Sequence, residues 1–370
     1  MIEISRYEVQ GGVSEYHVMI HVDNPRLAYA EQVKSVLSAY TQLLEGELKG
    51  AVTVLKRFFL SDAANQSDYL QTLLVEQEAC PLSIVEQSPL NGTKIALWAY
   101  LQKGVELKAL SHGMYEVKHG AYRHLWMAGA CHETSDAEAQ TRQLFDDYIT
   151  LLREQGCTLA ENCLRTWFFV QNVDVNYAGV VKARNEVFAT QNLTNQTHFI
   201  ASTGIAGRHA NHQVSVLMDA YAVQGIRQEQ IRYLYAPTHL NPTYEYGVSF
   251  ERGTAVDYGD RRQVFISGTA SINNKGEVVH PGDICNQTLR MWENVEVLLA
   301  EAECTFEHVS HLIVYLRDVA DYIVVKEMFD ERFPNIPKVY LLAPVCRPGW
   351  LIEMECMAVK TIHNERFPAY

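Results

Sequence analysis

Two glutamates near the C-terminal end of the chain have a spacing that acid catalysis can use. Glu353 and Glu355 stand in residues 350–359, an apolar run that follows a Pro-Gly turn and has the composition of a strand. Alternate side chains of a strand share a face, so both carboxyls project the same way, about 7 Å apart, while the opposite face is apolar. One carboxyl beside another is harder to ionise and is then a possible proton donor. The alternative is a half-solvated strand with two solvent-facing acids.

The composition indicates a soluble cytoplasmic protein with no nucleic-acid or membrane partner. The chain has 370 residues, of which 48% are hydrophobic, and a net charge of −13. This charge argues against a nucleic-acid partner, and an anionic ligand would need a local cationic pocket. No apolar run reaches the length of a membrane span or a signal peptide. The eight cysteines include no Cys-x-x-Cys pair, and we expect reduced thiols, no metal and no cofactor.

The elements that must position the glutamates are predicted to occur in three similar copies. Each copy has two strands, a long helix, an apolar strand, a second helix and a closing strand. The apolar strands are predicted at 51–60, 162–170 and 312–318, and the closing strands at 94–100, 213–223 and 350–359. We therefore predict an α+β fold of three tandem ββαβαβ units, at 1–105, 106–228 and 229–370, arranged as a pseudo-trimer. The alternative is that three generic α/β domains share this order by chance.

The third copy differs from the other two where the glutamates stand. By position in the repeat, residues 96–98 (Ala-Leu-Trp) and 217–219 (Leu-Met-Asp) replace the segment that begins at Glu353. Only one of three clefts is then expected to be acidic enough to act. This copy is predicted to open with strands at 247–254 and 263–267, after a connection at 224–243.

The third copy resembles the RidA/YjgF family over about residues 245–360. The matching segments are residues 264–268, 287–295, 314–318 and 352–355. That family forms trimers with ligand sites in the clefts between subunits, and some members hydrolyse reactive imines. The resemblance implies that one three-copy chain builds the same ring by itself, as a monomer or a small homo-oligomer.

A narrower resemblance, over roughly residues 160–360, is to chorismatases. It is carried by residues 267–272, by Phe250-x-Arg252 and by residues 346–355, which begin Cys-Arg-Pro and end Glu-Met-Glu; Arg165-x-Trp167 and the spacing of Tyr177 and Arg184 also match. Chorismatases have the RidA-type fold and split chorismate into pyruvate plus a cyclohexadiene diol or 3-hydroxybenzoate. The run after the tyrosine departs from the family pattern, and residues 1–105 are not explained by this resemblance.

The resemblance implies a set of site residues for a small anionic substrate. The catalytic candidates are Glu353 as general acid, Glu355 and Cys346. The substrate-binding candidates are Arg347, Arg184, Tyr177, Arg252, Gly268 and Lys338. A cysteine at 346 is implied to accompany the 3-hydroxybenzoate-forming branch, the alternative being an ordinary buried thiol. Each arginine taken alone is more often a surface salt-bridge partner than a ligand.

Two other functions remain open on the same fold. One is an imine or enamine hydrolase of the RidA type, in which an arginine binds the substrate carboxylate. An ungapped alignment puts Lys338 at that place, and a lysine lacks the bidentate fork of arginine. The other is a non-catalytic protein that binds a small metabolite.

Overall fold

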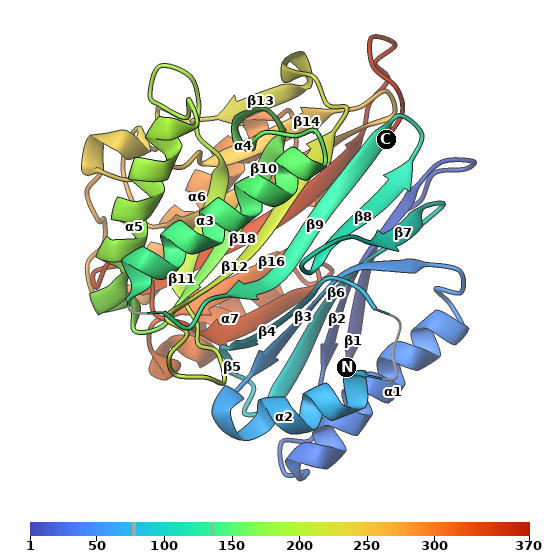
Figure 1. Cartoon of the computed structure of the whole chain (residues 1–370). Helices are drawn as coiled ribbons and strands as arrows, with labels where there is room; N and C mark the ends of the chain where they lie inside the picture. The colour runs from blue at the N-terminus through green and yellow to red at the C-terminus, as the bar shows by residue number, and fades with distance from the viewer. Residues whose placement is uncertain (76–78, 135) are drawn as a thin grey trace.

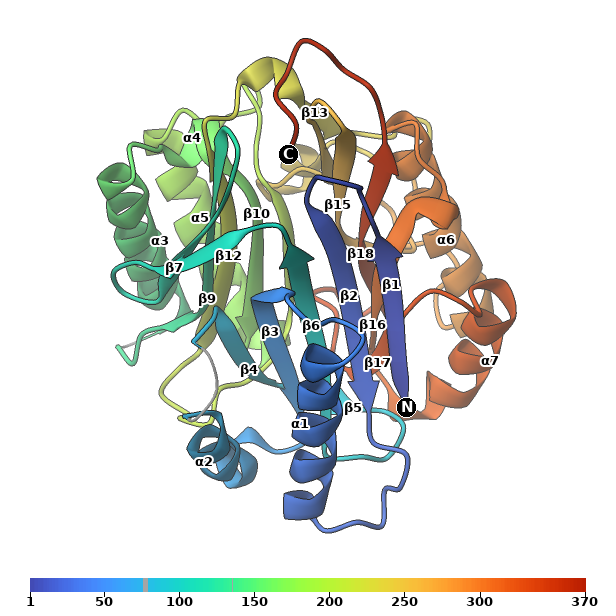
Figure 2. The same cartoon turned by 90° about the vertical axis from the view of Figure 1, so that its right-hand side faces the viewer.

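Three β-sheets face one another in the interior, and the long helices lie on the outside in three groups (Figures 1 and 2). The structure is a computed structural model that describes residues 1–75, 79–134 and 136–370. We divide the chain into three units, numbered in chain order, each of which provides five strands of one sheet and the helices that pack on it. No helix among the described residues has the length and apolar character needed to cross a membrane.

The elements of the three units follow one another along the chain. Unit 1 comprises β1 (Ile2–Tyr7), β2 (Ser14–His21), α1 (Tyr29–Glu45), β3 (Val52–Leu60), α2 (Ala63–Leu74), β4 (Leu82–Glu86), β5 (Ser88–Pro89) and β6 (Ile95–Lys103). Unit 2 comprises β7 (Glu106–Ala109), β8 (Met114–His119), β9 (Tyr122–Cys131), α3 (Ala137–Glu154), α4 (Leu159–Asn162), β10 (Cys163–Val170), α5 (Val173–Thr190), β11 (Ala201–Ala206) and β12 (Val216–Gln224). Unit 3 comprises β13 (Ile231–Leu234), β14 (Gly253–Asp257), β15 (Arg261–Ala270), α6 (Ile284–Glu301), β16 (Val309–Leu316), α7 (Tyr322–Arg332), β17 (Lys338–Leu342) and β18 (Ile352–Thr361).

The three sheets share one strand order. The orders are β1-β2-β6-β3-β4, β8-β9-β12-β10-β11 and β14-β15-β18-β16-β17, with β7, β13 and β5 added at edges. The predicted α+β class is confirmed, but each unit has two more strands than the four predicted: one in the shared order of five, and one of the edge strands β5, β7 and β13. The additional strands of the shared order, β4, β11 and β17, run parallel to β3, β10 and β16. They escaped prediction because they are only five or six residues long, and β11 is rich in small residues that have low strand propensity.

The start of unit 3 differs from its prediction. A 3-10 helix covers Thr243–Tyr246, and β14 begins only at Gly253 instead of at 247. Gly247 has a φ of +84°, a left-handed conformation that interrupts an extended strand. The segment between the 3-10 helix and β14 is therefore a loop, and it reaches the site described below.

Apolar burial on both faces explains why the central strands read as continuous hydrophobic runs. Every residue of β10 and β16 is buried, in positions that alternate between the two faces of the sheet. One face packs under the unit's own helices, as for Phe168 beneath α3 and α5. The other face joins a core shared by all three units, which includes Trp98, Trp126 and Ile313.

The outer edge of each parallel strand is bridged to a different unit. The edge of β17 pairs with β5 of unit 1 through Leu341–Pro89 and Leu342–Ser88. On β11, Ile205 forms an isolated bridge to Val345 of unit 3. On β4, Glu86 forms one to Arg208 of unit 2. Each of the three edges thus finds backbone partners within the same chain.

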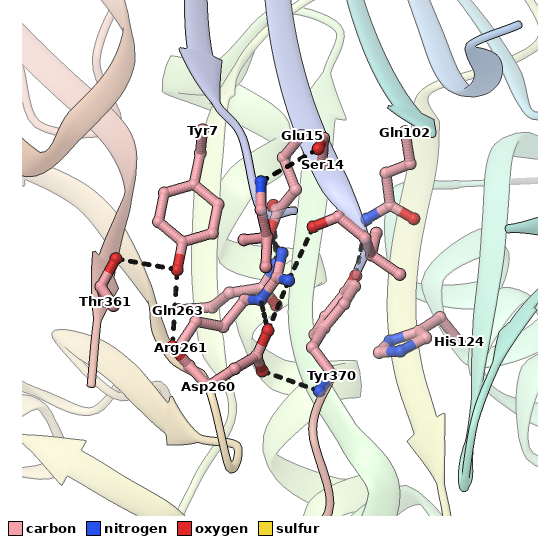
Figure 3. Close-up of polar contacts among 12 residues, drawn as sticks. Tyr7, Ser14, Glu15, Gln102, His124, Asp260, Arg261, Gln263, Thr361 and Tyr370 are labelled. Carbon is pink, nitrogen blue, oxygen red and sulfur yellow. Dashed lines mark hydrogen bonds and ion pairs between the residues drawn. The ribbon is translucent and has the colours of Figure 1, made fainter. Parts of the chain in front are cut away.

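A buried polar cluster joins β15 of unit 3 to β2 of unit 1 (Figure 3). Arg261 of β15 donates to the Glu15 carboxylate of β2 at 2.7 Å and to the carbonyl of Val13, also at 2.7 Å. Its guanidinium lies between the rings of Tyr7 and Tyr370, at 4.9 and 4.6 Å from their centroids. The side chains of Arg261 and Glu15 are 0% and 2% exposed. The two charges therefore depend on each other.

Replacing Arg261 by methionine should destabilise the protein strongly. The variant leaves Glu15 as a buried carboxylate without its cation, which costs about 3–5 kcal/mol of the free energy of unfolding. Urea denaturation measures this loss. The matched control is Arg153→Met on the exposed side of α3, which should change the free energy by less than about 0.5 kcal/mol. Equal effects of the two substitutions would contradict the importance assigned to the buried pair.

Candidate active site

A cavity of about 310 Å³ lies where unit 2 meets unit 3. Unit 2 contributes residues of α5 and β11, and unit 3 contributes residues of β15, the turn before β18 and the loop before β14. Seven of the predicted site residues line this cavity: Tyr177, Arg184, Arg252, Gly268, Cys346, Arg347 and Glu353. Side chains that are up to 176 positions apart in the sequence, from Tyr177 to Glu353, thus meet in one place.

Glu353 enters the cavity from β18, where it stands opposite Tyr315 of β16. Its carboxyl lies against the backbone of Gly268, and a Cβ added at Gly268 would overlap with Glu353 Oε1. The pairing of β15 with β18 shifts register between Ile266 and Thr269, next to this glycine. A glycine is needed at 268 because the carboxyl occupies the space of a side chain.

The Glu353 carboxyl keeps its proton at neutral pH. Burial raises the pKa of Glu353 from 4.5 to about 8, and the neighbouring Glu355 carboxylate adds to the rise. Arg165 and Arg252 act in the opposite direction, with smaller effects. A protonated carboxyl at the wall of a cavity is placed to act as a general acid.

The cavity is also lined by arginines that lack carboxylate partners among the described residues. Arg184 is buried, and its Nε and Nη2 atoms have no hydrogen-bond partner in the described part of the chain. Arg252 donates through Nη2 to the carbonyl and side-chain oxygens of Asn241 at 3.0 and 3.2 Å, while its Nε is unpartnered there. Buried guanidinium groups normally have anionic partners, so these two point to an anionic ligand.

Arg347 is held by aromatic rings rather than by an acid. Its guanidinium lies 4.5 Å from the ring centroid of Tyr246 and 4.8 Å from that of Trp350. Its Nη1 donates to the carbonyl of Gly276 at 3.2 Å. This stacking fixes the plane of the guanidinium and leaves it a donor at the wall of the cavity.

Tyr177 and Cys346 form another part of the wall. A Cβ added at Gly204 would lie 2.6 Å from Tyr177 Cε2, so a glycine on β11 lets the ring enter. Burial raises the pKa of Cys346 to about 12, and Glu353 adds to the rise. The thiol is therefore neutral near pH 7, and Cys346 shapes the pocket rather than supplying a nucleophile.

Glu355, the second predicted acid, does not line this cavity. It lies one strand step further along β18, where it bonds to residues of units 2 and 3. The sequence pattern showed that the two carboxyls share a face of the strand. It did not show that side chains of unit 2 hydrogen-bond to Glu355, whereas Glu353 faces the cavity.

Lys338 does not line this cavity either. It begins β17 and borders a different cleft, of about 420 Å³, where unit 3 meets unit 1. Its ammonium donates to the carbonyls of Phe333 and Ile336 at 2.9 and 3.2 Å. The residue at the same register position in unit 2 is Ser202, which does line the candidate site. Lys338 on β17 faces unit 1 and not unit 2. An alignment within unit 3 does not reveal which unit a residue faces.

The other two units have apolar residues where unit 3 has Glu353. Tyr315 pairs with Glu353, and the matching pairs are Phe169 with Leu217 and Phe59 with Ala96. The strand registers thus support the equivalence that the sequence predicted. Among the described residues, no group of three or more His, Cys, Asp or Glu side chains could hold a metal ion.

Sequence reasoning missed Tyr246 and Gly204 as site residues. Tyr246 lies between the predicted connection and the predicted strand, and Gly204 in a run that has no functional motif. The available signal for Tyr246 was the pair of tyrosines, Tyr244 and Tyr246, just before Gly247 and close to the junction of two units, since such loops border interfaces. No sequence signal identified Gly204.

The buried acid should make stability fall with pH. The folded pKa of Glu353, about 8, exceeds its ordinary value of 4.5, so the folded state holds a proton that the unfolded state has lost between these values. This residue therefore lowers the free energy of unfolding by about 1.4 kcal/mol per pH unit as the pH rises through that window. Glu353→Gln removes the effect, and its stability relative to wild type should grow with pH.

Urea denaturation at several pH values between about 5 and 8 measures the difference. The exposed Glu327→Gln on α7 is the matched control, and its difference from wild type should stay constant with pH. A constant difference for Glu353→Gln as well would show that Glu353 is ionised in the folded protein.

Comparison with known proteins places the third unit in a family. The model of the family described as Endoribonuclease L-PSP matches residues 253–360. The chain is 35% identical over 100 residues to a RutC family protein of Pyrococcus abyssi, a match that covers 26% of this chain and 78% of that protein. It is 31% identical over 97 residues to the 3-aminoacrylate deaminase RutC of Acinetobacter baylyi, which covers 26% and 77% of the two chains.

The whole chain shares its fold with a solved structure. A crystal structure of chorismatase superposes with a TM-score of 0.68, covering 93% of this chain and 98% of that one, at 18% identity. The match includes residues 1–105 in part, which the sequence resemblance left unexplained, because it extends over almost the entire chain. The predicted resemblances are confirmed at the level of family and fold: the chain belongs to the RutC family, through a RidA/YjgF-type domain in its third unit, and has the overall fold of chorismatase.

Proposed function

We propose that this protein is a chorismatase-type enzyme, which cleaves the enolpyruvyl ether of chorismate or a close relative and releases pyruvate. The observation that carries the proposal is one cavity that combines a protonated carboxyl with arginines lacking carboxylate partners among the described residues. An enol ether with two carboxylates on its skeleton needs both features. The shared fold with chorismatase supports the same conclusion.

Glu353 supplies the proton that starts the reaction. An enol ether is stable until its terminal carbon is protonated. Protonation gives an oxocarbenium ion, to which one water adds, and the resulting hemiketal breaks its bond to the ring oxygen and releases pyruvate and the ring alcohol. A carboxyl that stays protonated near pH 7 can deliver this proton, whereas an ordinary glutamate cannot. Burial, the main cause of the raised pKa, therefore creates the acid that the step requires.

The arginines orient the substrate. Chorismate carries one carboxylate on the ring and one on the enolpyruvyl group, and a guanidinium can bind each through two parallel hydrogen bonds. Arg184 and Arg252 come from units 2 and 3, and Arg347 comes from the turn before β18. They provide a cationic pocket in a chain whose net charge is −13, which makes the local field attractive to a dianion.

The position of Cys346 favours 3-hydroxybenzoate as the ring product. The resemblance associates a cysteine at this place with that branch, and the thiol lines the cavity. Addition of one water across the broken ether gives pyruvate and the cyclohexadiene diol. The phenol forms without net uptake of water, because the ring loses its other hydroxyl group as it becomes aromatic. A neutral thiol on the wall would affect which outcome prevails by shaping the space around the ring.

An enamine hydrolase is the second candidate. Its specific support is the 31% identity to 3-aminoacrylate deaminase RutC in the third unit. Hydrolysis of an enamine also begins with protonation at carbon, so Glu353 would serve there as well. The cavity of about 310 Å³ is large for a three-carbon substrate, however, and fits a ring with side groups better.

Incubation with chorismate tests the proposal directly. Wild-type protein should release pyruvate, followed with lactate dehydrogenase, together with an equimolar aromatic or diene product identified by chromatography. Glu353→Gln should lower kcat by about 100- to 10,000-fold, the usual contribution of a general acid. Glu327→Gln, on the exposed face of α7, should retain wild-type activity.

The alternatives give different results in the same preparation. Turnover of 2-imino acids generated by an amino-acid oxidase, without loss of chorismate, would replace the first function by the second. A well-folded protein inactive in both assays would overturn both. Thermal-shift screening with small carboxylates would then test the remaining possibility of a metabolite-binding protein.

A further inference from the structure

Glu355 forms an unusually dense set of contacts directly beside the proposed general acid. Its Oε1 accepts from Trp167 Nε1 and Tyr315 OH, each at 3.1 Å. Its Oε2 accepts from Arg165 Nη2 at 2.5 Å and from the Thr203 hydroxyl. Arginine and tryptophan side chains can only donate, and each Glu355 oxygen accepts from one of them, an arrangement suited to a carboxylate.

Three of these four donors come from unit 2, although Glu355 belongs to unit 3. Arg165 and Trp167 lie on β10, and Thr203 lies on β11. The Thr203 hydroxyl also accepts from the backbone N–H of Gly268, at 2.9 Å. The donors of Glu355 are thus connected to the glycine on which the Glu353 carboxyl rests.

Unit 1 reaches the same carboxylate. Arg57 of β3 donates through Nε and Nη2 to Asp219 at 3.2 and 2.7 Å, and its Nη1 lies 3.7 Å from Glu355 Oε1. Arg57 is 0% exposed, and Nη1 has no hydrogen-bond partner in the described part of the chain. A cation from each of the other two units therefore faces Glu355.

The two glutamates are close enough to influence each other's charge. Residues two apart on a strand are separated by about 7 Å, and both side chains lie away from solvent. A fixed negative charge at this distance opposes ionisation of its neighbour. The titratable and charged groups that face Glu353 are Glu355 on β18, Arg165 on β10, Tyr315 on β16, Tyr177 and Arg184 on α5, Arg252 before β14, and Cys346 and Arg347 before β18.

We infer that Glu355 is a positioning residue for the proposed reaction, a carboxylate that units 1 and 2 hold in place and that keeps Glu353 protonated. This inference rests on the proposed function only for the use made of the proton. It assigns a role to unit 1, whose described residues contribute no side chain to the cavity wall but include Arg57. It also gives different roles to two glutamates that share a strand face.

The same position in unit 2 supports this division of roles. Asp219 stands opposite Trp167 as Glu355 stands opposite Ile313, so the two acids occupy equivalent places. Asp219 is likewise held by donors, Arg57 and the N–H of Gly129 at 2.7 Å. Two residues before it stands Leu217 rather than a second acid. An acid at the position of Asp219 and Glu355 therefore takes part in the contact between units. Of these two units, only unit 3 has a second acid, Glu353, whose ionisation such an anion can influence.

The pH dependence of kcat/KM for chorismate tests the inference. In the wild-type protein the activity should fall above about pH 8, where Glu353 ionises. In Glu355→Gln this fall should move about 1–2 units toward acid pH, because the charge opposing ionisation is gone while Arg165 remains. Activity lost near neutral pH should then return near pH 5–6. Glu355→Asp keeps the charge and should keep the profile within about 0.5 unit of wild type.

A purely structural role gives another result. In that case Glu355→Gln lowers kcat/KM by the same factor at every pH, and the inference is overturned. Arg153→Met on the exposed side of α3 controls for a change of charge elsewhere and should leave the profile unchanged.

Infrared spectroscopy of the carboxyl C=O band tests the protonation of Glu353 without any turnover. The variant used is Glu353→Gln, which keeps the shape of the side chain. The difference between wild type and Glu353→Gln should contain one protonated carboxyl that titrates near pH 8. If the difference contains no such band, Glu353 does not hold a proton near neutral pH and the inference fails, even if Glu355→Gln does not fold. If the band behaves as expected but chorismate is not consumed, only the proposed function fails.

Discussion

Neutralisation of charge where the three sheets meet is the constraint on which the rest of the structure depends. Three fully buried arginine–carboxylate pairs cross the contacts between units: Arg57 with Asp219, Arg165 with Glu355, and Arg261 with Glu15. In the order given, the three arginines belong to units 1, 2 and 3, and their acids belong to units 2, 3 and 1. A buried pair adds little net stability, but loss of one partner is costly, so each pair favours one arrangement of its two units over displaced ones. Apolar sheet faces alone could pack in several registers, whereas these three pairs form together in only one arrangement.

The candidate site reverses that rule at one contact. In the unit 2–unit 3 cleft, cations stand without carboxylate partners among the described residues, and a carboxyl stands buried without an adjacent hydrogen-bonded cation of its own. Elsewhere among the described residues, Arg57, Arg165 and Arg261 each bond to an acid of a neighbouring unit. Departures from consistent pairing concentrate at functional sites, because the missing partner is supplied by the ligand. The apolar Leu217 and Ala96 at the equivalent positions show that the fold itself does not need an acid there.

The sequence pattern was sufficient for the strands and helices with long apolar runs, and for the position of Glu353. Residues 162–170 and 312–318 could be recognised as equivalent strands of a repeat because burial on both faces makes them continuously apolar. Short elements without such a run, such as β11, were missed. The surroundings of Glu355 and Lys338 could not be inferred, because each depends on which other unit faces it. The alternation of residues along a strand shows which side chains share a face. Which other unit packs against that face is determined only in the folded chain.

The bridges at the edges of β4, β11 and β17 also bear on how this fold avoids self-association. An exposed strand edge is a template on which a second molecule can add a strand, and proteins commonly block such edges. Here the blocking groups are tethered to the same chain, so they compete at a high effective concentration with any strand that arrives from solution. Pro89 adds to the effect on β17, because proline has no N–H with which to extend the ladder. The covalent linkage of three units thus supplies both the neighbours that complete the site and the caps that protect the sheet edges.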